Sequence, residues 1–120
     1  MVTLGLDIST TTVGYAFTKN KKILDMGFID IKKYKTHKDK SFFVLTHLSK
    51  SSYIDDVEQI YVEDNLSGFA GGRTSQQVII KLAKFNAVLC YMLEEEFQID
   101  VKNINPMTVR KNVFGKARIK

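Results

Sequence analysis

The first thirty residues alternate between apolar and polar side chains, and this pattern constrains the fold more than any other feature. Every second residue between Val2 and Ile8 is apolar, which predicts a strand that ends near Asp7. The hydroxyl-rich residues 9–12 predict a turn, and the apolar run 13–17 predicts a second strand. A third extended run covers residues 23–31. We therefore expect an antiparallel three-stranded meander at the start of the chain.

The rest of the chain alternates between helical and extended patterns. Gly27, inside the third run, is interpreted as the mark of a β-bulge. The further expected elements are a helix over 38–53, a strand over 59–62 that ends at Glu63, a helix over 75–96 capped by Ser75, a strand over 99–104, and a short helix over 106–113 stopped by Gly115. This order of elements, with strands first and alternating helices and strands afterwards, predicts an α/β fold with a mixed sheet flanked by helices.

Length and composition predict one globular domain over residues 1–120. The chain is 44% hydrophobic, which is enough for a core at this size. Met1 leads directly into the first strand, so we expect no leader peptide, and no apolar run is long enough to cross a membrane. Cys90 is the only cysteine and lies in an apolar helical stretch, which indicates a core residue in a reducing compartment. We expect a cytoplasmic protein.

The charge of the chain makes polyanions plausible partners. Lys and Arg total 18 against 13 Asp and Glu, a net charge of +5. The basic residues gather at 19–22, 32–40 and 110–120. A solvated basic surface explains the same pattern, so charge alone does not decide between the two interpretations.

Two acidic residues occupy equivalent places in the predicted sheet. Asp7 ends the first strand and Glu63 ends the fourth, each after an apolar run. If these strands are neighbours, the two carboxylates face each other and form hard oxygen ligands for magnesium or manganese. The alternative is that each acid is solvated or caps the following turn.

Three segments of the chain resemble a known family. "LGLDISTTTVGYAF", "IYVEDNLSGFAGGRTSQQVIIKLAKFNAVL" and "INPMTVRKNVFGKARIK" resemble, in order and spacing, the first three blocks of the RuvC-type Holliday junction resolvases. The first block is also similar to the split nuclease domain of RNA-guided CRISPR effectors, which shares the ribonuclease H-like fold. The resemblance implies that fold here, with three antiparallel strands joined by parallel ones.

The resemblance also implies an activity. The implied protein is a homodimeric endodeoxyribonuclease that cuts four-way DNA junctions with Mg²⁺, for which Mn²⁺ would substitute. Asp7 matches the first catalytic, metal-binding acid of the family and Glu63 matches the second. The family dimerises through the helix that corresponds to residues 75–96. Here Ala83 and Ala87 give that helix a small-residue face, although packing on its own sheet is the alternative.

The nucleic-acid contacts implied by the resemblance lie in two segments. In the glycine-rich loop 66–73, Leu66 matches the side chain that wedges between bases, Phe69 is suited to stacking, and Arg73 to a phosphate contact. The second set matches the basic segment that touches the scissile strand: Arg110, Lys111, Lys116, Arg118 and Lys120. A flexible connection and a solvated tail are the alternatives.

The chain departs from the family in its acidic residues, because no Asp or Glu follows Asp100. The remaining family acids belong to a later helix. Truncation of a longer resolvase is the explanation we favour, while completion of the site by another residue and binding without cutting stay open. Rival functions are a noncatalytic junction-binding module, an RNA-processing nuclease of the same fold, and an ATP-binding fragment of the actin and sugar-kinase superfamily.

Overall fold

A mixed five-stranded sheet forms the centre of the computed structural model, which describes residues 1–63 and 75–104. Its strand order is β3-β2-β1-β4-β5, with β2 antiparallel to β1 and β3, and with β1, β4 and β5 parallel. The strands are β1 (Val2–Ile8), β2 (Thr12–Lys19), β3 (Lys22–Asp30), β4 (Val57–Glu63) and β5 (Val101–Ile104). The expected meander and the expected mixed sheet are both confirmed.

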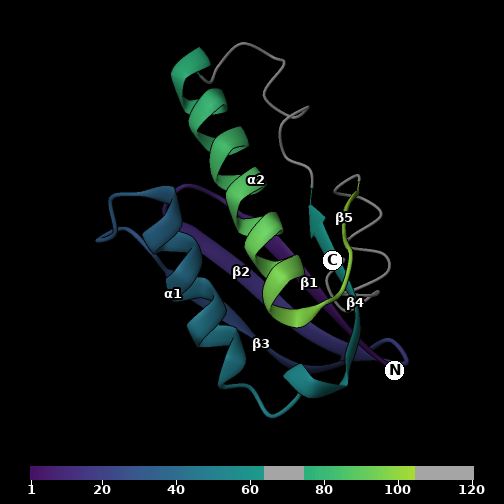
Figure 1. Cartoon of the computed structure of the whole chain (residues 1–120). Coiled ribbons are helices and arrows are strands. Elements are labelled where there is room, and N and C mark those ends of the chain that lie inside the picture. The colour runs from purple at the N-terminus through teal and green to yellow at the C-terminus, as the bar shows by residue number, and fades with distance from the viewer. Residues whose placement is uncertain (64–74, 105–120) are drawn as a thin grey trace.

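Both long helices lie on the same face of this sheet (Figure 1). They are α1 (His37–Ser49) and α2 (Gln76–Phe97), and a short 3-10 helix, η1 (Ile54–Asp56), precedes β4. The alternation in β1 explains the arrangement, because Leu4, Leu6 and Ile8 all point toward the helices and are buried. They form one core cluster with apolar residues of β4, α1 and α2. None of the helices in the described ranges is long and apolar enough to cross a membrane.

The opposite face of the sheet, called here the second face, presents the other set of alternating side chains. Its middle holds Ala16 of β2, which is buried, with Tyr61 of β4 and Ile104 of β5 packed against it. Asp7 and Glu63 belong to the same set by alternation with Leu6 and Val62. The main core therefore lies on one side of the sheet, and the side chains of Asp7 and Glu63 lie on the other.

Local hydrogen bonds account for the helix boundaries. The Thr36 side chain accepts a hydrogen bond from the Asp39 N–H (3.0 Å), which caps α1. The Ser75 side chain accepts from the Val78 N–H (3.3 Å), so the expected cap of the second helix is confirmed. α2 ends where Gln98 adopts a left-handed conformation, with φ of 56°.

The structure corrects the expected bulge in the third strand. The register between β2 and β3 shifts between Phe17 and Thr18, so Leu24 is the extra residue and Gly27 pairs regularly with Tyr15. Gly27 has a different reason to be glycine: a Cβ there would lie 2.8 Å from the Tyr15 hydroxyl oxygen. The expected helix over 106–113 and its stop at Gly115 lie outside the described residues.

Candidate functional site

Asp7 and Glu63 lie side by side at the carboxyl ends of two neighbouring strands. β1 and β4 are parallel and adjacent, and their register pairs Leu6 with Val62. Continuing that register by one residue on each strand brings Asp7 beside Glu63. Residues in register point to the same face of a sheet, and because Leu6 and Val62 point toward the helices, the two acids point to the second face. The condition on which the expected carboxylate pair depended, that these two strands are neighbours, is met.

The two carboxyl groups have different environments. Glu63 is only 3% exposed, whereas Asp7 is exposed to solvent. Mg²⁺ is usually held by one or two carboxylates, with water and substrate phosphate oxygens filling its other positions. The pair matches that donor set, although within residues 1–63 and 75–104 there is no cluster of three or more His, Cys, Asp or Glu. The residues present therefore fit a magnesium ion that is shared with a phosphate.

A row of residues crosses the second face at the level of the two acids. Cα pairing runs from Phe28 on β3 to Gly14 on β2, and from Gly14 to Asp7 on β1. A Cβ placed on Gly14 would lie 3.3 Å from Cε1 of Phe28 and 3.8 Å from Cβ of Asp7. Glycine at position 14 thus leaves room for the Phe28 ring next to the carboxylate. The sequence signal for Phe28 is that it is out of phase with Ile29 and Ile31, which are buried.

The turn after β1 is held by the Ser9 side chain. The N–H groups of Thr11 and Thr12 donate to Ser9 Oγ (3.3 and 3.0 Å), and the Ser9 N–H donates to the Thr12 carbonyl (2.9 Å). A phosphate-binding turn needs backbone N–H groups that point outward to the ligand. Because these three are engaged within the turn, the geometry disfavours the rival interpretation as an ATP-binding fragment.

Lysines from two separate elements gather where α1 and α2 begin. The pKa of His37 is lowered below 6.5 by burial of its ring and then by the charges of three lysines that lie close enough to act on it, Lys40, Lys84 and Lys81. The His37 ring stacks on Phe85 at 6.1 Å between centroids. We call these three lysines the lysine cluster.

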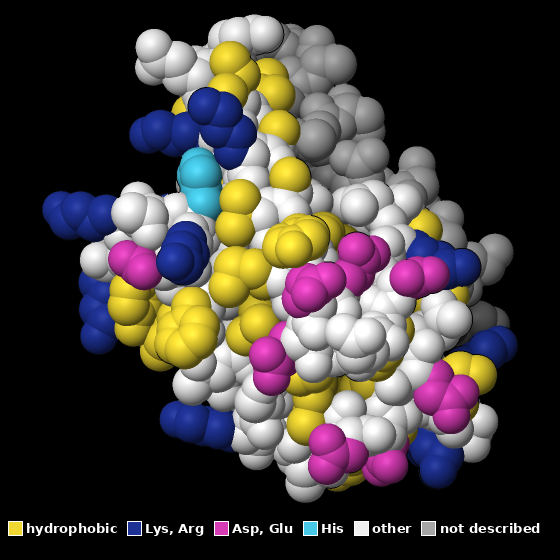
Figure 2. All heavy atoms as spheres, viewed as in Figure 1, with side chains coloured by type: hydrophobic (Ala, Val, Ile, Leu, Met, Phe, Trp, Pro, Cys, Tyr) yellow, Lys and Arg dark blue, Asp and Glu magenta, His cyan; other side chains and the backbone are white. Residues whose placement is uncertain are grey.

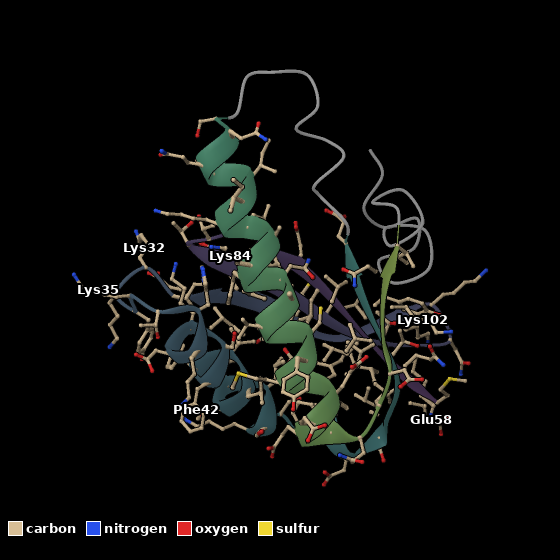
Figure 3. The ribbon with its side chains drawn as sticks, turned by 45° about the horizontal axis from the view of Figure 1, so that its top comes forward. Lys32, Lys35, Phe42, Glu58, Lys84 and Lys102 are labelled. Atoms are coloured by element: carbon tan, nitrogen blue, oxygen red, sulfur yellow. The ribbon has the colours of Figure 1, made fainter. Side chains whose placement is uncertain are left out.

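The lysine cluster is connected to the turn that follows Asp7. The Nζ atom of Lys40 donates to the Thr10 carbonyl at 2.6 Å. Figure 2 shows Lys side chains over the beginnings of both helices. Lys32 and Lys35 lie on the same side of the molecule as Lys84 (Figure 3). The sequence showed the basic stretch 32–40, but the addition of Lys81 and Lys84 depends on helix packing.

The other expected nucleic-acid contacts fall outside the described residues. These are Leu66, Phe69, Arg73, Arg110, Lys111, Lys116, Arg118 and Lys120. On the expected dimer helix, Ala83 is half-buried and Ala87 is exposed.

Comparison with solved structures gives the fold. The structure of T. thermophilus RuvC in complex with a Holliday junction substrate matches with a TM-score of 0.68 and 15% identity, over 92% of this chain and 68% of that chain. The fold is RuvC-like. A second Thermus thermophilus RuvC structure matches with a TM-score of 0.64 and 16% identity, over 96% of this chain and 70% of that one.

The RuvC-like fold confirms the ribonuclease H-like α/β class expected from the sequence. Sequence comparison with protein-family models finds no match, and comparison with curated proteins finds none either. The resemblance of the three sequence blocks to RuvC-type resolvases is thus supported at the level of the fold.

Proposed function

We propose that this chain is a magnesium-dependent nuclease domain that acts on four-way DNA junctions, with Asp7 and Glu63 as metal-binding catalytic carboxylates. The observation that carries the proposal is the placement of the two acids in register on adjacent parallel strands, on the face away from the core. The RuvC-like fold supports it, because one of the matching structures holds a Holliday junction substrate. Branched DNA is therefore the substrate to test first.

The chemistry divides between the ion and the protein. A bound Mg²⁺, with Mn²⁺ as a substitute, supplies charge neutralisation at the phosphate and lowers the pKa of water. Because Asp7 is exposed, it is the carboxylate that a phosphate would approach. Glu63 is buried and would hold the metal ion from within the sheet. The strands keep both groups in a fixed register, which is the positioning that phosphoryl transfer requires.

The lysine cluster supports a polyanionic partner. Lys40 joins the cluster to the turn after β1, so the cluster lies near the end of β1 that carries Asp7. Contacts to backbone phosphates contribute affinity without reading sequence, and they weaken as salt rises. Binding that is unchanged between low and moderate salt would contradict this part of the proposal.

The homodimer implied by the resemblance is also proposed to form through α2. Exposed apolar side chains on that helix support it, namely those of Val78, Ile80 and Tyr91.

The test is to incubate the chain with labelled four-way and linear duplex DNA in Mg²⁺ or Ca²⁺, and to score binding and nicking separately. We expect junction-selective nicking in Mg²⁺, loss of nicking in Asp7→Asn, and junction binding that survives this change. Asp55→Asn is the matched control, because Asp55 is an exposed carboxylate in η1, before the start of β4.

Each other outcome favours a stated alternative. Mg²⁺-dependent nicking by Asp7→Asn would remove Asp7 from its role. Junction binding without nicking by the unchanged chain would favour a noncatalytic junction-binding module. Equal action on structured RNA, with no preference for junctions, would favour an RNA-processing nuclease of the same fold.

A further inference from the structure

Phe28 is a large aromatic side chain exposed on the second face of the sheet. It is 76% exposed, the highest value among the exposed large apolar residues of the described chain. Single exposed apolar residues are common and need no explanation by themselves. The position of Phe28 makes it informative, because it lies in the row that contains Asp7 and Glu63.

The ring of Phe28 is directed toward the two acids. Its Cε1 and Cδ1 atoms would be 3.3 and 3.4 Å from a Cβ on Gly14, so the ring lies across Gly14. Gly14 is paired directly with Asp7. Since neighbouring strands are about 4.8 Å apart, the backbones of β3 and β1 are about 10 Å apart, and the ring covers part of that distance. An aromatic surface and a carboxylate pair are therefore presented together on rigid strands.

We propose that Phe28 packs against a nucleoside of the strand whose phosphate is held at Asp7 and Glu63. This inference rests on the proposed function. A nucleic-acid strand carries a planar base and a sugar next to each phosphate, which matches an aromatic ring next to a metal-binding carboxylate pair. Bases stack on aromatic side chains without strong sequence preference.

The proposal also accounts for a preference for branched DNA. In continuous duplex each base is already stacked between its neighbours, so a protein ring gains nothing without unstacking it. Bases at a branch point or in a single strand expose a face to the protein. Phe28 is thus expected to favour nucleotides beside the crossover, as a substrate-contacting residue that takes no part in bond breaking.

A matched control is available on the other side of the molecule. Phe42 of α1 is 65% exposed and belongs to the helical layer, away from the row of acids (Figure 3). Phe28→Ala and Phe42→Ala remove the same ring from exposed sites, so both variants should fold like the unchanged chain. Phe28→Trp keeps an aromatic surface at the tested position.

The experiment uses the full chain in Ca²⁺ with junctions that carry 2-aminopurine at successive nucleotides around the crossover. We expect a fluorescence change on binding at one of these positions, lost in Phe28→Ala and retained in Phe28→Trp and Phe42→Ala. The dissociation constant for the junction should rise about tenfold in Phe28→Ala, the size expected for loss of one stacked base.

The outcomes separate this inference from the function on which it rests. If Phe28→Ala binds the junction with unchanged affinity and an unchanged fluorescence profile, Phe28 contacts no nucleoside and the inference is wrong while the proposed function stands. If Phe42→Ala has the same effect as Phe28→Ala, the contact is not specific to the second face and the inference is wrong as well. If the unchanged chain binds no junction, the proposed function fails first and this inference fails with it.

Discussion

Two glycines on adjacent strands make room for aromatic rings, one on each face of the sheet. Gly14 accommodates exposed Phe28 on the second face, and Gly27 accommodates Tyr15 on the face toward the helices. Tyr15 is held in place there, with ring centroids 5.9 Å from Phe17 and 5.6 Å from His47. Both places have an aromatic ring packed over a glycine, but they differ in how far the ring can move.

Gly27→Ala tests this difference. The new Cβ would meet the Tyr15 hydroxyl oxygen at 2.8 Å and its Cζ at 3.1 Å, and the packed ring has little freedom to yield. We expect the free energy of unfolding in urea to fall by about 1–3 kcal/mol, as for other overpacked sites. Gly14→Ala is the control and should cost less, because the Phe28 ring can turn into solvent. Equal losses in the two variants would show that the packing around Tyr15 is not the cause.

His37 provides a prediction about pH. Burial of its ring, followed by the charges of Lys40, Lys84 and Lys81, lowers its pKa in the folded chain below the ordinary 6.5. The unfolded chain therefore binds more protons as pH falls through 6.5, so this group's contribution to the free energy of unfolding decreases toward acid. Urea unfolding at several pH values should show a smaller acid loss in His37→Gln than in the unchanged chain. Parallel pH profiles for the two proteins would contradict the prediction.

At the scale of elements, the sequence predicts strands and helices well where one residue pattern decides them. Alternation in β1 and the cap at Ser75 are local signals, and both gave the right element. The sequence predicts the bulge at Gly27 and not at Leu24, because the position of a bulge depends on the register between two strands. The lysine cluster was seen only in part, because Lys81 and Lys84 join it when α2 packs against α1. The row from Phe28 to Glu63 likewise cannot be predicted without the order of the strands in the sheet.

The packing of these elements predicts where charge reversal weakens DNA binding. Lys81→Glu with Lys84→Glu should weaken junction binding and reduce the slope of log affinity against log salt by up to about 2, since each lost phosphate contact contributes about 1. The control, Lys19→Glu with Lys22→Glu, makes the same charge change at the β2–β3 hairpin, which lies at the opposite end of the strands from Asp7. Salt titrations of binding measure both. Equal slopes in the two double variants would exclude a specific role for the cluster.

At the scale of the whole molecule, the acidic residues at the C-terminal end of α2 are unfavourable for the stability of the helix itself. The last turn of α2 contains Glu94, Glu95 and Glu96 and no basic residue, although cations are favoured at that end of a helix. Figure 2 shows acidic side chains over this region and basic ones over the beginnings of the helices. Only Glu94 has a clear structural use, since its carboxylate accepts from the Val101 N–H (2.9 Å). This polarity suits a protein that meets a polyanion with one end.

Hydrogen exchange with and without junction DNA in Ca²⁺ tests that polarity. If the basic end receives the DNA, exchange should slow in the turn over residues 9–12 and in the first turns of α1 and α2. The groove between the later turns of the helices, which includes Phe42 and Tyr91, should be unaffected, because its two carboxylates, Glu95 and Glu96, outnumber its one lysine, Lys50, and repel phosphate. Protection of that groove instead would place DNA at the acidic end of α2, away from Asp7 and Glu63. Such a result would contradict the nuclease proposal even if junction binding were tight, because no phosphate would then reach the carboxylate pair.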